Sequence, residues 1–553
     1  MTHETTTPRP TRVDLPADAG LRPTIGKIGL LFTGIGSVIG SGWLFAALDS
    51  SRIAGPAALL AWILCLVMYA VIGLTYAELG SMFPVAGGVA RYPQYSFGSF
   101  ASFTMGWITW LALVSVPPIE VLATLTYASN YIPDVTRTED GVAVLTGLGM
   151  VFAVVLMLFY TVLNVMGAKA FARFNNVLVW WKLGVIVLVI IAFALAAFHP
   201  HNFNASEHGG FAPNGLDAVF VALAAGGIGF TLTGFRQGIE LAAETDNPKK
   251  NVPFAVLGSI VICALLFIAL QVVFVGALPE SALEQGWSHL SFANDFGPLA
   301  GLALILGLSG VAVILYVDAI VSPLDAGIIY AAVAARLSYS QGRNGNAPAW
   351  LTKLNRQGAP WTSIVVMFVV GCLFLLPFPS WQKAATFYTS ATLLSFGSGP
   401  LVLATLRKQL PDQPRPFRVK GGAAVPLLAL LCSNLIVYWA GWETVARLFI
   451  AVVAGYVVLA LTMWLAKDRT RIPPLQMSSF SWIAVWFVGL ALISWLGQYG
   501  GGRGVIPSGI DALAVAALSG LTYWVAVRKP LTSEQVVENV ERTRMAEAEP
   551  EAG

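Results

Sequence analysis

The chain has 553 residues, of which 56 % are hydrophobic and only 11 % are charged, whereas a soluble domain carries roughly 25 % charged residues. A membrane-crossing helix needs about 20 apolar residues, and the mean hydropathy of +0.72 indicates that most of the chain lies in such helices. This composition excludes a soluble enzyme. The formal net charge of +3 is too small for the basic face that nucleic acids require, so we expect no nucleic-acid partner.

Apolar runs between charged or Pro/Gly-rich breaks predict about fourteen spans and an all-α integral membrane protein. The third and eighth runs are too long for one straight crossing, so they should be tilted or should project into solvent. The predicted ranges, in order, are 25–48, 54–80, 98–131, 143–163, 174–198, 214–238, 253–276, 302–336, 360–378, 384–406, 423–441, 444–466, 481–497 and 509–527.

The ends and loops of the chain predict its orientation. The first 24 residues lack the apolar stretch of a cleavable signal peptide, so we expect the first span to direct insertion. If the N-terminus is cytoplasmic, most of the 32 Lys and Arg residues fall in cytoplasmic segments, which supports that orientation and an even number of spans. The acidic segment after Lys529 then forms a cytoplasmic tail, which we expect to be solvated and disordered.

The four cysteines each stand alone in an apolar run, without the spacing of a zinc site or a disulfide framework, so we expect them to be packing residues. They are Cys65, Cys263, Cys372 and Cys432.

Two of the predicted spans contain glycine clusters that a packed helix avoids. G-I-G-S-V-I-G-S-G occupies residues 34–42, and G-G-I-G-F-T-L-T-G-F-R occupies residues 226–236. Small residues at such spacings also allow close helix packing. Two clusters five spans apart nevertheless favour broken helices, whose free amides bind a carboxylate and whose free carbonyls bind an ammonium group or a cation.

The order of several further motifs resembles the amino acid–polyamine–organocation (APC) superfamily of transporters, from about Ile25 to Lys420. The motifs are A-G-P-A at 54–57, Y-A-E-L-G-S-M-F-P-V-A-G-G at 76–88, E-T-D-N-P-K-K-N-V-P at 244–253, G-R-N-G-N-A-P at 342–348 and R-P-F-R-V at 415–419. The resemblance implies a five-plus-five inverted repeat in which helices 1 and 6 are broken and hold the substrate. It divides the chain into an N-terminal cytoplasmic tail (1–24), a ten-helix core (25–406), helices 11 and 12 with the preceding loop (407–466), a linker with helices 13 and 14 (467–527), and a C-terminal cytoplasmic tail (528–553).

The resemblance also implies which backbone groups bind an amino acid substrate. The amides of the first break would hold the α-carboxylate, helped by the positive end of the following half-helix; they belong to Gly40, Ser41 and Gly42. Carbonyl groups would hold the α-ammonium, namely those of Val38, Phe230 and Thr233. Phe230 also occupies the position of an aromatic gate over the substrate.

The sequence departs from the family pattern at Gly234-Phe235-Arg236, where many members read G-F-E. Arg236 either extends to the cytoplasmic interface or forms a two-pronged pair with a side-chain carboxylate of the substrate, which would favour aspartate or glutamate. The G-F-R pattern resembles the aspartate:proton symporter branch, which also carries additional C-terminal spans. A second departure, Val89-Ala90-Arg91, replaces aromatic residues that are common in the inner loop.

Ionisable residues inside apolar spans are costly and therefore candidates for function. Lys182 matches a lysine that, in proton-coupled relatives, replaces the sodium ion beside helices 1 and 8; a static ion pair is the alternative. Asp318 and Ser322 share one helix face, with Asp325 a further turn along, and we expect one or both acids to face Lys182 or a water-filled passage. Glu120, which follows two prolines, is a third candidate for the proton site, and a structural hydrogen bond is the alternative for each acid.

The sequence thus predicts a secondary transporter that brings an acidic amino acid into the cell with a proton. A neutral amino acid symporter or an exchanger is the alternative. A membrane-embedded enzyme is disfavoured because no acid/base or metal cluster converges: the histidines at 199, 201 and 208 fit a solvated outer loop better than a metal site. We expect no cofactor besides the coupling proton, an amino acid and the lipid bilayer as partners, and a location in the cell membrane with both termini cytoplasmic.

Overall fold

The computed structural model describes residue 12 and residues 25–85, 87–139, 142–166, 168–292, 297–343, 346–356, 359–465, 475–477 and 480–548. The predicted N-terminal tail therefore lies, apart from residue 12, outside the described residues.

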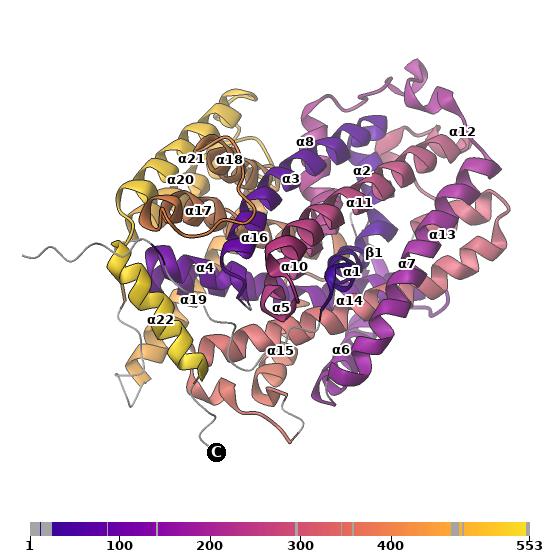
Figure 1. Cartoon of the computed structure of the whole chain (residues 1–553). Coiled ribbons are helices and arrows are strands. Elements are labelled where there is room, and N and C mark those ends of the chain that lie inside the picture. Colours follow the sequence, from indigo (N-terminus) through magenta and orange to yellow (C-terminus); the bar gives the residue numbers. More distant parts are fainter. Residues whose placement is uncertain are drawn as a thin grey trace, which may run out of the picture.

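Helices make up nearly all of the described structure (Figure 1). The helices of eight residues or more are α1 (Lys27–Val38), α2 (Gly42–Ala54), α3 (Ala58–Met82), α4 (Gly88–Phe97), α5 (Ser99–Ala128), α6 (Gly147–Val165), α7 (Ala168–Ala196), α8 (Asp217–Ala225), α11 (Pro248–Ala277), α13 (Pro298–Ile305), α14 (Ser309–Arg343), α15 (Trp361–Phe374), α16 (Trp381–Phe396), α17 (Ser398–Gln409), α18 (Ala424–Trp439), α19 (Trp442–Leu465), α20 (Phe480–Leu496), α21 (Ile510–Arg528) and α22 (Ser533–Ala548). Shorter helical pieces are η1 (Gly55–Ala57), η2 (Pro200–Phe203), η3 (Ser206–His208), α9 (Ile228–Leu232), η4 (Thr233–Arg236), α10 (Gln237–Glu240), η5 (Ala242–Glu244), α12 (Glu280–Leu283), η6 (Trp287–His289) and η7 (Ala349–Thr352).

The lengths and composition of these helices confirm an all-α membrane protein. Among the described residues, nine helices or joined helices are long and apolar enough to cross a membrane, and a bent pair, α8 with α9–α10, makes a tenth candidate. Four shorter apolar helices, α1, α15, α18 and α20, fall within other predicted ranges. The count of fourteen spans and the inverted repeat therefore stay predictions.

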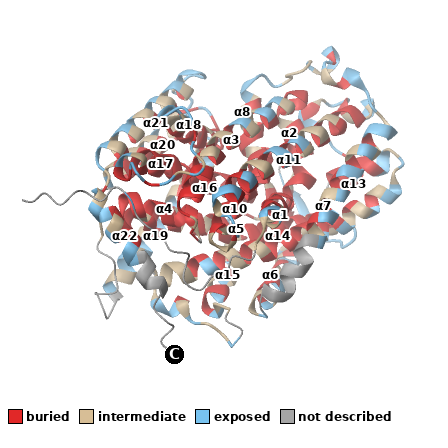
Figure 2. Ribbon diagram, viewed as in Figure 1, coloured by how far each residue is buried: buried red, intermediate tan, exposed pale blue. Residues whose placement is uncertain are grey.

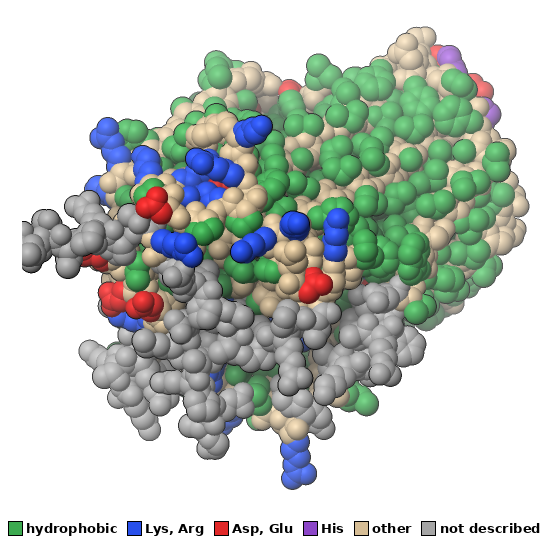
Figure 3. All heavy atoms as spheres, viewed as in Figure 1, with side chains coloured by type: hydrophobic (Ala, Val, Ile, Leu, Met, Phe, Trp, Pro, Cys, Tyr) green, Lys and Arg blue, Asp and Glu red, His purple; other side chains and the backbone are tan. Residues whose placement is uncertain are grey.

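The interior lies where α5 packs against α14 and α16 and where α1 packs against α11, and exposed residues lie toward the periphery (Figure 2). Hydrophobic side chains cover a broad part of the outer surface (Figure 3), which in water would be an unusually large apolar patch. A lipid bilayer is the environment that this surface fits.

Two local elements differ from the expected ranges. The predicted eighth span at 302–336 is wrong at its start, because α13 ends at Ile305 and α14 begins at Ser309. Gly307 between them has φ +73°, a left-handed conformation that ends a helix and suits glycine; the apolar run continues through this turn, so hydropathy alone did not show it. A short antiparallel hairpin of β1 (Thr136–Glu139) and β2 (Val142–Leu145) also follows α5, where no strand was expected.

The long third and eighth spans are confirmed as long helices. α5 has 30 residues and α14 has 35, which at about 1.5 Å per residue gives roughly 45 and 52 Å. Both exceed the roughly 30 Å of a hydrocarbon core. The two helices pack against each other, so each is supported along its length by the other.

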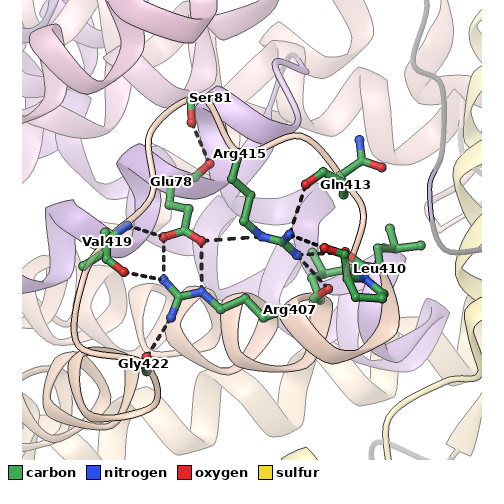
Figure 4. Close-up of polar contacts among 10 residues, drawn as sticks. Glu78, Ser81, Arg407, Leu410, Gln413, Arg415, Val419 and Gly422 are labelled. Atoms are coloured by element: carbon green, nitrogen blue, oxygen red, sulfur yellow. Dashed lines mark hydrogen bonds and ion pairs between the residues drawn. The ribbon is translucent and has the colours of Figure 1, made fainter.

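A buried carboxylate ties α3 to the loop after α17 (Figure 4). Glu78 accepts hydrogen bonds from Nε and Nη2 of Arg407 at 2.9 and 2.6 Å and from the amide of Val419 at 2.7 Å. Nε of Arg415 lies 3.8 Å from Oε1 of the same carboxylate. The Y-A-E-L-G and R-P-F-R-V motifs, distant in sequence, therefore meet at one charge-assisted contact, which is stronger than a neutral hydrogen bond.

The prediction of a disordered C-terminal tail is wrong for residues 533–548, which form α22. This helix packs against α4. Val536 and Val540 lie four residues apart on one face and are buried, whereas Glu538 is exposed and pairs with Arg542. The many charged residues of the segment led to the prediction of disorder, although Val536 and Val540 form a narrow apolar stripe with helical spacing.

Hydrogen bonds before α22 fasten the same segment to two helix ends. The amide of Leu531 donates to the Ser96 carbonyl at 3.2 Å, and Gln409 Nε2 donates to the carbonyls of Leu531 and Ser96 at 2.8 and 3.1 Å. The Ser533 hydroxyl donates to the Gln409 carbonyl at 2.7 Å. The segment thus joins the end of α4 to the end of α17.

We predict that Val536→Asp releases α22 from α4. The change places a charge in an apolar contact and removes the burial of a valine, worth about 1.5–3 kcal/mol. Trypsin cleavage after Arg528, or after Arg542 within α22, should become at least several-fold faster in the purified protein. Glu538→Ala, on the exposed face of the same helix, should leave the rate unchanged; equal rates for both variants would contradict the docking.

Candidate functional site

The first glycine cluster contains a break in the helix. α1 ends at Val38 and α2 begins at Gly42. Within the break, the Gly40 amide donates to the Val38 carbonyl at 3.1 Å, and the Ser41 amide donates to Oε2 of Glu120 at 2.9 Å. The first of the three amides expected to bind a carboxylate is thus used within the turn, and the second holds a carboxylate of the protein itself.

The second glycine cluster contains the matching break. α8 ends at Ala225, the chain bends by 52°, and Gly227 has φ +83°, a conformation that a residue with a Cβ rarely adopts. The two breaks touch: a Cβ at Gly234 would lie 2.3 Å from the Val38 nitrogen, and one at Gly42 would lie 2.3 Å from Cγ2 of Thr231. Glycine is required at Gly234 because the backbone of Ser37 and Val38 passes so close, and it is favoured at Gly42 because the side chains of Thr231 and Phe230 fill the space that a Cβ would need.

Aromatic side chains of α16 enclose these breaks, although the sequence analysis did not single them out. Trp381 donates from Nε1 to the Ser41 hydroxyl at 2.8 Å, and the Tyr388 hydroxyl donates to Oγ1 of Thr233 at 3.0 Å. Both rings make edge contacts with Phe230, with ring centroids 5.5 and 5.2 Å apart. Their spacing of seven residues places them on one helix face, which is the signal in the sequence that would have found them.

The carbonyls expected to bind an ammonium group already carry hydrogen bonds. The Phe230 carbonyl accepts from the Thr233 hydroxyl at 2.8 Å, and the Val38 carbonyl accepts the Gly40 amide. A carbonyl oxygen has two lone pairs, so the Val38 carbonyl retains the capacity for one further donor. The Phe230 carbonyl also accepts the Thr233 amide, so a ligand there would have to share or displace one of these two donors.

Lys182 of α7 lies between α1 and α14. Its Nζ donates to the Gly36 carbonyl at 3.1 Å and to Oδ2 of Asp325 at 2.5 Å, and both charged side chains are fully buried. Asp318, by contrast, accepts hydrogen bonds from the Ser322 hydroxyl at 2.8 Å and from Nε1 of Trp181 at 2.9 Å. Of the two acids on this face, the structure pairs Lys182 with Asp325.

Arg236 is completely buried, so its side chain does not reach the surface of the protein. Its Nη2 donates to Oε1 of Glu240 at 3.1 Å, and its guanidinium carbon lies 5.6 Å from the ring centroid of Phe396. Nε and Nη1 have no hydrogen-bond partner among the described residues. Glu240, which the sequence analysis did not name, is four residues from Arg236, the spacing of a helical ion pair. The guanidinium therefore binds Glu240 through Nη2, and its Nε and Nη1 groups can still donate hydrogen bonds to a ligand.

Outside this site, the remaining candidates have local partners. Arg91, in the second departure from the family pattern, is buried within α4. His201 pairs with Glu207 at 2.5 Å in the exposed loop between α7 and α8, where the hydrogen bond from the imidazole lowers the pKa of Glu207 to about 2 and raises that of His201.

Comparison with known proteins shows the family to which the chain belongs. The family model described as amino acid permease matches residues 25–492. The chain belongs to the amino acid permease family of the APC superfamily. It is 35 % identical over 519 residues to the glutamate/serine transporter AimA of Bacillus subtilis, covering 93 % of this chain and 95 % of the relative. It is 32 % identical over 499 residues to the aspartate-proton symporter of the same organism, covering 90 % and 94 %.

The branched-chain amino acid permease BcaP of Bacillus subtilis is more distant, at 26 % identity over 459 residues, covering 80 % of this chain and 94 % of the relative. The family and these relatives are transporters and permeases, so this member is an integral membrane transporter of amino acids and not an enzyme.

We predict that Lys182→Met destabilises the protein by about 3–5 kcal/mol, because it leaves the Asp325 carboxylate buried without its partner. Lys182→Met with Asp325→Asn should recover most of the loss, since no net charge then remains buried. The thermal unfolding midpoint of the purified protein measures both. Arg447→Met, which breaks an exposed pair with Glu443, should change it little. Equal midpoints for the single and double variants would show that the pair contributes nothing.

Proposed function

We propose that this permease imports an acidic amino acid together with a proton. The observation that carries the substrate class is the buried Arg236 guanidinium, which spends one edge on Glu240 and keeps Nε and Nη1 unpaired. A buried unpaired donor is costly, and a carboxylate is the group that a guanidinium fork pairs with best. Two relatives named for glutamate and aspartate support the same class.

The common part of the amino acid fits the two breaks. Its α-carboxylate would accept the amides of Ser41 and Gly42, and its α-ammonium would donate to the carbonyls of Val38, Phe230 and Thr233. Phe230, held at its edges by Trp381 and Tyr388, would cover the bound substrate. Arg236, three residues beyond Thr233 on the same broken helix, would then meet the side-chain carboxylate.

The proton as coupling ion is supported by Lys182. Its ammonium group lies against the Gly36 carbonyl of α1 and the Asp325 carboxylate of α14, where a sodium ion would need oxygen ligands. The lysine ammonium is part of the protein and stays in place, whereas a bound sodium ion would be released in each transport cycle. The free energy for uptake must therefore come from another ion. The name of the aspartate-proton symporter among the relatives agrees with this reading.

We also infer that the end with α4, α17 and α22 faces the cytoplasm. Lys and Arg gather at that end of the surface in Figure 3, as the positive-inside rule requires of cytoplasmic segments. Both chain ends would then be cytoplasmic, with a core at 25–406 and α18–α21 outside it.

Uptake into proteoliposomes tests this function. We expect labelled aspartate or glutamate to accumulate when the outside is made acidic, to stop accumulating with a proton ionophore, and to need no sodium. Uptake that requires sodium and ignores the ionophore would exclude proton coupling. Accumulation of neutral amino acids alone would favour the neutral symporter, and uptake only against preloaded amino acid would favour the exchanger.

We predict that Arg236 sets the preference for aspartate over asparagine. A charged hydrogen bond contributes about 1.5–3 kcal/mol, which corresponds to a roughly 10- to 150-fold preference. Arg236→Gln should remove most of it, and Arg236→Lys should restore only part, because an ammonium lacks the two-pronged geometry. Competition of each amino acid against labelled substrate measures the ratio.

The control for this prediction addresses the partner of the arginine. Arg236→Gln leaves Glu240 buried and unpaired, so Arg236→Gln with Glu240→Gln should fold better while showing the same lost preference. If all three variants keep the ratio of the parent protein, Arg236 does not contact the substrate.

A further inference from the structure

A side chain of the protein itself occupies the break between α1 and α2. Glu120 lies on α5, three helices away in sequence, and its Oε2 accepts the Ser41 amide at 2.9 Å. Its other oxygen is so close to the turn that a Cβ at Gly40 would lie 2.6 Å from it. Glu120 is itself almost fully buried. A carboxylate therefore rests where the proposed function places the carboxylate of the substrate.

The charged and titratable groups that face Glu120 come from three other helices. Lys182 of α7 is the nearest cation, Asp325 and Tyr330 belong to α14, and Tyr160 belongs to α6. Lys182 is already paired with Asp325, so it does not bind Glu120 directly. The Ser41 amide is the partner that keeps the Glu120 carboxylate stable in this interior.

One amide N–H cannot serve two carboxylates at full strength, and two carboxylates at contact distance repel each other. A buried carboxylate that loses the hydrogen bond from the Ser41 amide is costly, and protonation removes that cost. Asp318 and Asp325 have other partners and do not touch the break. Displacement at Ser41 therefore acts on Glu120 before any other acid.

We propose that Glu120 and the substrate α-carboxylate bind the Ser41 amide in turn, and that Glu120 takes up the coupling proton when the substrate displaces it. The hydrogen bond from Ser41 to Glu120 breaks, the one from Ser41 to the substrate forms, and one Glu120 oxygen gains a proton from the outside water. When the substrate leaves toward the cytoplasm, Glu120 releases that proton and returns to the amide. This inference rests on the proposed function and specifies how binding and coupling are joined.

Proton uptake on substrate binding is the direct test. With the purified protein in weakly buffered solution, a pH-indicator dye should record about one proton taken up for each aspartate or glutamate bound. Glu120→Gln should bind substrate with no proton uptake, since its side-chain oxygen still accepts the Ser41 amide but carries no charge. Thr124→Val is the matched control one turn along α5, because that hydroxyl donates to the carbonyls of Glu120 and Ala319 and, within the described part of the chain, makes no hydrogen bond to a carboxylate; it should take up protons as the parent does.

The pH dependence of the substrate affinity gives a second readout, because the affinity should fall as the pH rises. Because binding consumes a proton, the parent protein should bind about tenfold more weakly for each pH unit over the range in which Glu120 is ionised in the free protein and protonated in the complex. Glu120→Gln should bind independently of pH over that range. An infrared difference spectrum should show the carbonyl stretch of a protonated carboxyl group when substrate is added to the parent protein, and should lack it in this variant. If Glu120→Gln does not fold, Glu120→Ala serves the same comparison.

A substrate without an α-carboxylate separates displacement from simple protonation. Aspartate blocked as its α-amide should neither displace Glu120 nor cause proton uptake. The proposal is overturned if Glu120→Gln still takes up one proton per substrate, or if the α-amide drives proton uptake as well as aspartate does. A parent protein that binds neither aspartate nor glutamate would instead overturn the proposed function.

Discussion

Backbone groups released inside a membrane protein must find partners, because lipid and packed side chains supply none. The two helix breaks of this permease release such groups at its centre, and the surrounding structure serves to pair them. The Ser41 amide finds Glu120, the Gly229 carbonyl accepts the Tyr69 hydroxyl at 2.7 Å, and Trp381 holds the Ser41 hydroxyl. Where the breaks meet, glycine removes the side chains that would keep the two backbones apart. The site is thus a place where ordinary helix hydrogen bonds are replaced by side chains from α3 and α5, while α16 binds the hydroxyls of Ser41 and Thr233; these are groups that a ligand can displace.

Buried charge follows the same rule of compensation. Lys182 with Asp325, Arg236 with Glu240, and Glu78 with Arg407 each combine a cation with a carboxylate inside the protein. A buried ion pair adds little stability compared with apolar packing, so stability alone is a weak reason for so many. The pairs differ in how many of their hydrogen-bonding groups remain without a partner among the described residues. Glu78 is satisfied by several donors, whereas Arg236 keeps unpaired N–H groups, and this asymmetry distinguishes a structural fastening from a group able to bind a ligand.

Much of this arrangement could be predicted from the sequence, and the reason is local. Glycine clusters in apolar runs reveal helix breaks because no other residue tolerates such close backbone, and ionisable residues in apolar runs reveal the interior charges. The partners could not be predicted. Asp318 and Asp325 share a face of α14, and only the rotation of that helix against α7 decides which one meets Lys182. Trp381 and Tyr388 resemble ordinary apolar residues of a span until α16 is packed against the breaks.

The same distinction explains the docked C-terminal segment and joins it to the site. Its charge suggested disorder, but two valines four residues apart suffice to seat α22 once α4 offers a complementary surface. α4 is in turn held at its start, where the Gly87 amide donates to the Glu240 carbonyl at 3.2 Å. Glu240 is the partner of Arg236. A continuous series of hydrogen bonds and packed residues therefore connects the C-terminal helix, through α4, to the Arg236 guanidinium, on which the proposed substrate choice depends. Any movement that carries α4 away from the broken helix formed by α8, α9 and α10 must also change the surroundings of Arg236.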